Sequence, residues 1–383
     1  MSVLGEHLTD DQAMNLAMLE AEKGAGFVSP NPMVGCVILD SHGRFLSKGY
    51  HKIFGGPHAE INALEGLSLE QLESARVFVT LEPCAHEGKT PSCAKALARL
   101  PLKEVIYGLV DPNPLVAGSG ANIISEAGIK TTLYNKNHEN LEEVCEHFLM
   151  NFRSQRPFVS VKIASSLDGQ LGLKTGESKW ITGEVSRQKS RYLRAIHDVT
   201  VVGKNTLLMD DPQLNIRHDN FPEKENKILI LDSTGECLKF PGLRIFETHR
   251  PENIFVAVSD SMNHAEGPAE NKTERDSSSL AQVLKVQRHP QGGLNLNELL
   301  RKLWKLGVKS VFVEGGAQAV SSFIEQKEAH RLYLFQAPIL LGANSGKPWS
   351  EGVSIKKMSD RISLKNPKIQ RLESDLLITG RLF

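Results

Sequence analysis

Three residues in the first half of the chain could bind a transition metal through one imidazole and two thiolates. They are His58 and the cysteines Cys84 and Cys93, which eight residues separate. Three protein ligands of this kind are typical of a catalytic zinc ion, which keeps its fourth position for water, whereas a structural zinc ion has four protein ligands. The residue types therefore predict a hydrolytic zinc site. The alternative is a closed structural site with a further ligand such as His86.

The glutamate two positions after His58 helps to distinguish these alternatives. The signature H-x-E followed by P-C-x-x-C is typical of zinc deaminases, in which the glutamate is not a ligand but carries protons between water and the departing amine. His58, Glu60 and Cys84 fit this signature, whereas Cys93 lies further along the chain than the signature requires. A structural site needs no such glutamate, so Glu60 favours catalysis. The spacing of Cys93 argues against a generic cytidine or tRNA adenosine deaminase.

The longer cysteine spacing resembles one particular family. The run Pro83-Cys-Ala-His-Glu-Gly-Lys-Thr-Pro-Ser-Cys93, with Pro30-Asn-Pro-Met-Val-Gly35 upstream, is similar to the deaminase half of a bifunctional riboflavin-biosynthesis enzyme. That enzyme is the diaminohydroxyphosphoribosylaminopyrimidine deaminase/5-amino-6-(5-phosphoribosylamino)uracil reductase. The resemblance implies one zinc ion per chain, held by His58, Cys84 and Cys93, with Glu60 as the catalytic proton shuttle. It also implies five side chains that hold the substrate's pyrimidine and phosphoribosyl groups, namely Asn31, His51, His86, Lys89 and Thr90.

A glycine-rich turn in the second half could hold the phosphates of a nucleotide. The usual dinucleotide fingerprint G-x-G-x-x-G is missing after the first strand of this half. Glu314-Gly-Gly-Ala-Gln-Ala-Val320 instead follows a predicted strand and opens a predicted helix, which places small residues and free N–H groups where a pyrophosphate can approach. Without other support, a Gly-Gly pair after a strand is more often just a tight turn.

Other segments of the second half supply that support through the same resemblance. Lys162-Ile-Ala-Ser-Ser-Leu-Asp-Gly169, residues 176–182, Arg194 and residues 202–217 have the order and spacing of the reductase half of the riboflavin enzyme, whose fold is similar to that of dihydrofolate reductase. The resemblance implies that Leu214 and Glu314 lie on the substrate side. It also implies a set of NADPH contacts, namely Ala164, Trp180, Thr206, Asp210, Gly315, Gly316, Ala317, Gln318, Ala319 and Val320.

Two arginines and a serine are suited to holding the ribose phosphate of the substrate. Arg194 and Arg217 offer charge-assisted, often bidentate hydrogen bonds, and Ser178 adds a hydroxyl group. Lys162 is a candidate for assisting proton transfer, although a lysine within a strand is also found in structural ion pairs. Each residue taken alone has an ordinary explanation, such as a solvated charge or, for Trp180, a place in the core. Their joint spacing is what favours a reductase site.

Both halves alternate strands with helices, which predicts layered α/β sheets. In the first half, Thr9 or Asp10 caps a helix, β-rich runs follow at 34–39, 75–81, 105–110 and 129–134, and helices begin near His58, Ser92 and Ala121. A helix near 138–150 closes this half. The second half has predicted strands at 158–164, 198–203, 227–231, 254–258 and 310–313, and helices at 184–195, 295–306 and 316–325. It ends on β-like segments from 331 to 383.

The pattern restarts near residues 151–157, and we expect a domain boundary there. The resemblance implies a zinc-dependent deaminase domain at 1–152 with a cytidine-deaminase-like three-layer α/β/α fold. It implies an NADPH-dependent reductase domain at 153–383 with a dihydrofolate-reductase-like α/β fold. Residues 260–279 are polar and turn-rich, and we interpret them as a surface excursion rather than as a site.

Composition and charge restrict the class of protein further. The 383 residues carry 45 Lys+Arg and 45 Asp+Glu, so no global field exists to hold nucleic acid or an anionic membrane. We find no apolar run long enough for a spanning helix and no secretory leader. The five cysteines lack the spacing of a disulfide framework, and Cys36, Cys145 and Cys237 are expected to be packed or free thiols. We expect a cytoplasmic homo-oligomeric enzyme with a small-molecule substrate and with neither nucleic-acid nor membrane partners.

The two halves together predict a two-step activity. The first step is zinc-dependent hydrolytic deamination of 2,5-diamino-6-(5-phosphoribosylamino)pyrimidin-4(3H)-one, and the second is NADPH reduction of the ribosyl group to ribityl. One alternative is a deaminase fused to an inactive reductase-like domain, and another is a non-catalytic, zinc-stabilised nucleotide-binding regulator. Glu60 argues against the regulator. The predicted phosphate-binding residues and the glycine-rich turn argue against an inactive second half.

Overall fold

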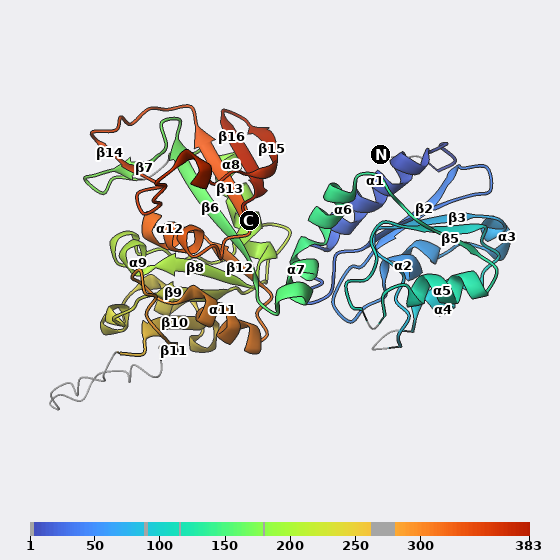
Figure 1. Ribbon diagram of the computed structural model, residues 1–383, viewed down its shortest axis with the longest axis horizontal. Coiled ribbons are helices and arrows are strands. Elements are labelled where there is room, and N and C mark those ends of the chain that lie inside the picture. The colour runs from blue at the N-terminus through green and yellow to red at the C-terminus, as the bar shows by residue number, and fades with distance from the viewer. Residues whose placement is uncertain (1–3, 88–90, 115, 179–180, 262–279) are drawn as a thin grey trace. The chain divides into compact units, whose positions relative to one another are not determined.

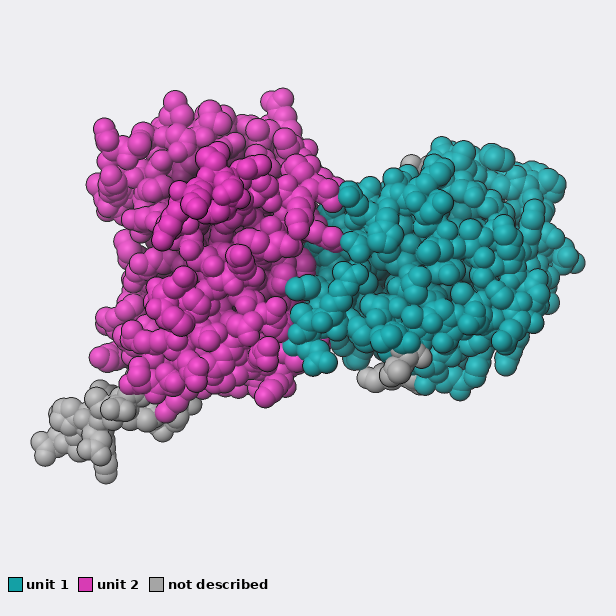
Figure 2. Space-filling model, viewed as in Figure 1, with its two compact units in different colours: residues 1–155 teal, residues 156–383 magenta. Residues whose placement is uncertain are grey.

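The chain forms two compact units, Met1–Gln155 and Arg156–Phe383 (Figure 2). The computed structural model describes residues 4–87, 91–114, 116–178, 181–261 and 280–383. Lys89, Thr90, Trp180 and nearly all of the polar stretch 260–279 lie outside the described residues. Each unit has its own sheet and its own buried apolar clusters, so each is described by itself.

The first unit, which holds the N-terminus in Figure 1, is built around a five-stranded sheet. The order of its strands is β2-β1-β3-β4-β5. Strand β1 is antiparallel to both of its neighbours, and the β3–β4 and β4–β5 pairs are parallel. Its elements are α1 (Asp10–Ala21), η1 (Glu22–Gly24), β1 (Gly35–Leu39), β2 (Phe45–Tyr50), α2 (Ala59–Leu64), α3 (Leu69–Leu72), β3 (Arg76–Val79), α4 (Cys93–Leu97), β4 (Glu104–Tyr107), α5 (Ser119–Glu126), β5 (Lys130–Leu133), α6 (His138–Val144) and α7 (Glu146–Ser154).

Helices cover both faces of this sheet, which explains why every residue of β1 is buried. Successive side chains of a strand point to opposite faces. Val37 and Leu39 accordingly pack in one apolar cluster with α1, α6 and α7, whereas Cys36 and Ile38 pack in a second cluster with α2, α4 and α5. This arrangement confirms the predicted three-layer α/β/α fold.

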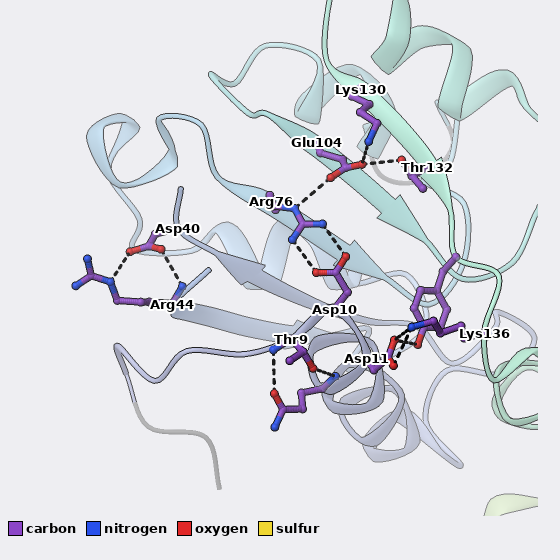
Figure 3. Close-up of polar contacts among 12 residues, drawn as sticks. Thr9, Asp10, Asp11, Asp40, Arg44, Arg76, Glu104, Lys130, Thr132 and Lys136 are labelled. Atoms are coloured by element: carbon purple, nitrogen blue, oxygen red, sulfur yellow. Dashed lines mark hydrogen bonds and ion pairs between the residues drawn. The ribbon is translucent and has the colours of Figure 1, made fainter. Parts of the chain in front are cut away.

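Polar contacts join α1 to the middle of the sheet (Figure 3). Thr9 caps α1 through a reciprocal capping box with Gln12, which places the start of the helix where the sequence predicts it. Arg76 on β3 forms ion pairs with Asp10 at 2.7 Å and with Glu104 on β4 at 3.1 Å. Glu104 also accepts a 2.6 Å hydrogen bond from the Thr132 hydroxyl on β5. One arginine and one glutamate therefore connect the first helix with three neighbouring strands.

The second unit is built around a nine-stranded sheet with the order β11-β10-β9-β8-β12-β6-β13-β16-β15. Its elements are β6 (Phe158–Ser166), β7 (Gln170–Leu173), α8 (Glu184–Ile196), β8 (Val199–Gly203), α9 (Lys204–Asp210), β9 (Lys227–Leu231), η2 (Glu236–Lys239), α10 (Arg244–Thr248), η3 (Pro251–Asn253), β10 (Ile254–Ser259), β11 (Gln282–Val286), α11 (Leu296–Lys305), β12 (Ser310–Val313), α12 (Ala317–Glu325), β13 (Arg331–Ala337), β14 (Gly346–Pro348), η5 (Met358–Asp360), β15 (Lys365–Leu372) and β16 (Asp375–Arg381). Strands β7 and β14 form a separate two-stranded sheet.

Parallel pairing brings the carboxyl ends of the central strands to one edge of the large sheet (Figure 1). Strands from β11 through β13 pair in parallel, and only β16 and β15 are antiparallel additions. Helices α11 and α12 pack against one face, and α8 packs against the other. Loops at the carboxyl ends of such strands are the usual position of a ligand site in an α/β sheet.

Several short elements were missed from the sequence, among them β2, β7 and α9, and one predicted helix is in fact two. Strand β2 contains Ser47 and Lys48 at the edge of its sheet, so it lacks the apolar run of a buried strand. Strand β7 and helix α9 are only four and seven residues long. The helix predicted at 138–150 is two helices, α6 and α7, which meet at Cys145, where φ is −101° and ψ is 8°. Among the described residues, no helix is long and apolar enough to span a membrane.

Candidate active sites

Three elements of the first unit bring His58, Cys84 and Cys93 together. His58 is the extended residue directly before α2, Cys84 lies in the loop after β3, and Cys93 is the first residue of α4. His58 Nδ1 lies 3.5 Å from Cys84 Sγ and 3.3 Å from Cys93 Sγ. The Ser92 hydroxyl donates a 2.8 Å hydrogen bond to the Cys84 carbonyl, which fixes the two cysteine segments against each other.

The arrangement of these donor atoms fits zinc. Zn–S and Zn–N bonds of about 2.3 and 2.0 Å, at tetrahedral angles, place sulfur and nitrogen about 3.5 Å apart. The three donor atoms all lie within 4.8 Å of one another, and no other such group of three occurs among the described histidine, cysteine, aspartate and glutamate residues. His86 is not part of the group. A three-ligand site is therefore favoured over a closed four-ligand site within the described part of the chain.

The environment of the two thiols favours ionisation of Cys84. A hydrogen bond from Cys93, together with the neighbouring imidazole of His58, holds the pKa of Cys84 well below its ordinary value. The Cys93 N–H also donates to Cys84 Sγ at 3.3 Å. The side-chain hydrogen bond that Cys93 donates to Cys84, together with burial, raises the pKa of Cys93. One thiolate is thus already favoured without a metal, and a bound cation would stabilise the second.

Glu60 lies next to this group but is not one of its members. It is the second residue of α2 and is buried. Its Oε2 atom has no hydrogen-bond partner among the described residues. Burial raises the pKa of Glu60 to about 7. A buried carboxyl group with an unpartnered oxygen is suited to exchanging a proton with a ligand in the adjoining cavity.

A cavity of about 400 Å³ adjoins the metal-ligating group. Its walls include three of the predicted substrate residues, which are Asn31, His51 and His86, together with His58, Glu60 and Cys84. Lys89 and Thr90 lie outside the described residues. Except for Cys93, which contacts His58 from outside the wall, the described members of the predicted deaminase site therefore line one cavity, and their individual roles stay predictions.

Hydrogen bonds fix the orientation of two of these side chains. His51 Nδ1 donates to the Pro57 carbonyl at 3.0 Å, so its Nε2 atom is an acceptor for Asn31 Nδ2 at 3.2 Å. The His51 ring also packs edge-to-face on His58, with 5.2 Å between centroids. The Asn31 and His51 side chains are therefore already oriented before a substrate binds in this cavity.

Two acidic residues of the cavity wall, Glu82 and Asp111, were missed from the sequence. The Glu82 carboxylate accepts hydrogen bonds from four backbone N–H groups, those of Asp111, Gly118, Gly120 and Ala121, at 3.0–3.2 Å. It therefore fastens the loop after β4 and the start of α5 to the loop that carries Cys84. The available signal was position, because both acids follow neighbouring parallel strands and must lie at the same edge of the sheet.

A second cavity, of about 650 Å³, lies within the second unit at the carboxyl ends of β6, β8, β9 and β12. It brings together most of the predicted reductase residues. Those that line it are Lys162, Ala164, Ser178, Thr206, Asp210, Glu314, Gly315, Gly316, Ala317, Gln318, Ala319 and Val320. Arg187 and Lys204 also line it and were not predicted. Trp180 lies outside the described residues.

The glycine-rich turn is packed closely against α9. Gly316 has φ of 78°, a conformation that non-glycine residues rarely adopt, and a Cβ atom there would lie 2.8 Å from Thr206 Oγ1. Helix α12 begins directly after the turn and lines the cavity with its first residues. Small residues are therefore required here, and the turn presents backbone N–H groups at a helix N-terminus, an arrangement that suits the phosphates of a dinucleotide.

Arg194 has protein partners rather than an open position in this cavity. Its guanidinium forms two hydrogen bonds of 2.8 Å to the Glu314 carboxylate and one of 2.6 Å to the Asn215 carbonyl. Although burial opposes ionisation, Arg194 and Lys162 keep the pKa of Glu314 below its ordinary value. Arg217 is exposed, and neither arginine lines the cavity, nor does Leu214. Residue type alone cannot show whether an arginine faces a ligand or a buried acid, and the predicted phosphate-binding role of both stays a prediction.

Both units match known family models. Residues 8–109 match the cytidine and deoxycytidylate deaminase zinc-binding region, and residues 157–378 match the RibD C-terminal domain. The chain is also similar over its length to solved structures. RibD from Acinetobacter baumannii has a TM-score of 0.78 at 31% identity, covering 97% of this chain and 98% of that one. A deaminase/reductase from Thermotoga maritima has a TM-score of 0.78 at 32% identity with the same coverage.

Curated relatives agree with these likenesses. The riboflavin biosynthesis protein RibD of Aquifex aeolicus is 33% identical over 375 residues, covering 96% of this chain and 97% of the relative. That of Haemophilus influenzae is 34% identical over 377 residues, covering 96% and 95%. With both cavities, both family models and full-length relatives in agreement, the chain belongs to the RibD family of riboflavin biosynthesis proteins.

Proposed function

We propose that this chain catalyses two consecutive steps of riboflavin biosynthesis. The first is hydrolytic deamination of 2,5-diamino-6-(5-phosphoribosylamino)pyrimidin-4(3H)-one. The second is reduction of the ribosyl group of the deaminated product, which gives 5-amino-6-(5-phosphoribitylamino)uracil. Its cofactors are zinc in the first unit and NADPH in the second. Membership of the RibD family supports both activities, and the two separate cavities supply a place for each.

In the deamination step, water adds to the ring carbon that carries the amino group, and ammonia leaves. His58, Cys84 and Cys93 would hold the zinc ion, which would supply Lewis acidity for activating the water. Glu60 takes a proton from the water and returns it to the departing amine, for which its buried, unpartnered Oε2 atom is suited. Asn31, His51 and His86 hold the pyrimidine in the cavity.

In the reduction step, opening of the ribosylamine ring exposes an imine carbon. When bound, NADPH would supply hydride chemistry for this carbon. The turn from Gly315 to Val320, with Ala164, Thr206 and Asp210, holds the cofactor, and the Lys162 ammonium supplies a proton on the substrate side. Ser178, Leu214, Arg217 and the Arg194–Glu314 pair orient the phosphorylated substrate, with Arg194 acting in part through Glu314.

The observation that carries the proposal is the position of Glu60 beside the three-ligand group and in the wall of the same cavity. Glu60→Gln should retain one zinc per chain, because the residue is not a ligand. It should lose about 10²–10⁴-fold of deaminase turnover, since it removes the group that transfers the proton. Reduction of supplied deaminated substrate should be unchanged. The measurements are metal analysis, ammonia release and NADPH oxidation on the full chain.

A matched control is Glu65→Gln, which changes a carboxylate just after α2 that does not line the cavity. This variant should keep both activities. If Glu60→Gln deaminates within a few-fold of the wild type, then Glu60 is not the proton shuttle.

Further parts of the proposal concern organisation. We assign deamination to a domain at 1–152 and reduction to a domain at 153–383. A cytoplasmic location fits a site that requires reduced cysteines, because disulfides seldom persist there. We also propose a homo-oligomer, to be tested by light scattering, and a small-molecule substrate without a nucleic-acid or membrane partner.

A further inference from the structure

The order of strands in the second unit sets the direction in which an extended cofactor must lie. Lys162 and Ala164 are on β6, and the glycine-rich turn follows the neighbouring strand β12. Lys204 follows β8, and Ser233 follows β9, on the opposite side of the turn. Because adjacent strands are about 4.8 Å apart, the cavity edge from β6 to β9 is about 14 Å long. With the hydride end near Lys162 and the pyrophosphate at the turn, the adenosine end reaches β8 and β9.

The acidic residue at the end of β9 is not available to this adenosine. In many dinucleotide-binding folds, an aspartate or glutamate at such a position binds the ribose 2′-hydroxyl of NAD. Asp232 lines the cavity but is 1% exposed, and both of its oxygens already have partners. Oδ1 accepts from the Thr234 hydroxyl at 2.9 Å, and Oδ2 accepts from the Cys237 N–H at 2.8 Å. The carboxylate that would usually select NAD, that of Asp232, is therefore already hydrogen-bonded within the protein.

The wall of the cavity offers a lysine, Lys204, instead of a free acidic residue. Lys204 lines the cavity as the first residue of α9, and its side chain is 27% exposed. Its Nζ atom lies 2.7 Å from Glu236 Oε2, on the short helix η2 that follows β9. The hydrogen bond that Lys204 donates to Glu236 raises the pKa of Lys204, so the group stays an ammonium at neutral pH. The Glu236 carboxylate is more exposed than the lysine, at 44%, and can move aside for a second anion.

We propose that Lys204 binds the 2′-phosphate of the reductase cofactor and selects NADPH over NADH, with Glu236 holding the lysine in position. This inference rests on the proposed reductase function. The 2′-phosphate is the only group that distinguishes the two cofactors, and an ammonium beside the adenosine end is an ordinary partner for a phosphate. Glu236 competes with that phosphate, because both bind the same ammonium.

The direct test is binding of the oxidised cofactors NADP⁺ and NAD⁺ to the full chain by titration calorimetry. Lys204→Gln should weaken NADP⁺ binding about tenfold, the lower end for a charged hydrogen bond, because Glu236 already offsets part of the charge. NAD⁺ binding should change less than twofold. Lys204→Arg should retain most of the NADP⁺ affinity. Lys239→Gln, which changes an exposed lysine on η2 outside the cavity, is the matched control and should change neither affinity.

A second variant should change the NADP⁺ affinity in the opposite direction. Glu236→Gln keeps the shape of the side chain but removes the competing charge, so NADP⁺ should bind a few-fold more tightly while NAD⁺ does not. The proposal is wrong if Lys204→Gln weakens both cofactors equally, or leaves NADP⁺ unchanged, or if Glu236→Gln weakens NADP⁺. Failure of the proposed reductase function would look different, because the wild-type chain would then bind neither cofactor.

Discussion

The second unit should lose stability as the pH falls from 7 to 5, because two of its histidines are held in the neutral form. His197 is 1% exposed, hydrogen-bonds the Leu193 carbonyl and the Ser160 hydroxyl at 2.7 and 2.8 Å, and stacks on Phe312. His330 Nδ1 accepts the Val159 N–H at 2.9 Å, a bond that protonation of that atom would break. Burial lowers the pKa of each to about 4.

The size of the effect follows from proton linkage. An unfolded histidine has a pKa of about 6.5, so between pH 6.5 and 4 the unfolded chain binds protons that the folded chain does not. Stability is therefore lost as the pH falls through 6.5, and the loss is complete only near pH 4. At pH 5 each histidine lowers the free energy of unfolding by about 2 kcal/mol relative to pH 7, or about 4 kcal/mol for the pair.

Urea unfolding followed by tryptophan fluorescence is the appropriate assay. All three tryptophans, Trp180, Trp304 and Trp349, belong to the second unit, so the signal reports that unit alone. His197→Gln should reduce the pH dependence between 7 and 5 by about half, whatever its effect at pH 7. His138→Gln, at an exposed position in the first unit, is the control. A His197→Gln profile parallel to that of the wild type would show that folding does not keep His197 in the neutral form.

Three further predictions concern the two sites. Arg194→Ala removes the partner of the Glu314 carboxylate, whose side chain is 11% exposed, so it should destabilise the second unit in urea unfolding by about 3 kcal/mol, the lower end for a buried ion pair. It should also raise the KM for the pyrimidine more than that for NADPH, and a rise confined to NADPH would assign the arginine to the cofactor. Cys93→Ser should lose the zinc of freshly purified protein by metal analysis, whereas Cys237→Ser should retain one zinc per chain. Gly316→Ala places a Cβ atom where φ is 78° and ψ is 129°, at a strain of about 1–3 kcal/mol, and should weaken NADP⁺ binding about tenfold in calorimetry while ammonia release is unchanged; unchanged NADP⁺ binding would exclude the turn from the cofactor site.

Elements whose limits depend on local residues were predicted closely, whereas features that depend on distant partners were not. The starts of α2 and α4 were expected near His58 and Ser92, and the elements in fact begin at the next residues, Ala59 and Cys93. A buried strand such as β12 was bounded correctly, because four successive residues are apolar or small and all are buried. The edge strand β2 carries a mixed pattern and was missed.

The same distinction holds for the sites. The metal-ligating types of His58, Cys84 and Cys93 are visible in the sequence, and the structure brings them together. The partner of Arg194 is not visible, because Glu314 lies 120 positions away and only the pairing of β12 with β8 brings it near. Lys204 has the appearance of a surface lysine until the order of the strands places it beside a cavity.

The central position of strand β6 affects how the second unit folds while the chain is being synthesised. It pairs with β12, where Phe158 is opposite Ser310, and with β13, where Ser160 is opposite Arg331. Both edges of this apolar strand therefore stay unpaired until about 150 further residues have left the ribosome, which takes roughly 8–30 s at bacterial rates of elongation. During that time β6 is an exposed template for aggregation. We expect the nascent second unit to depend on a chaperone far more than the first unit, whose β1 finds both of its partners within about 45 residues.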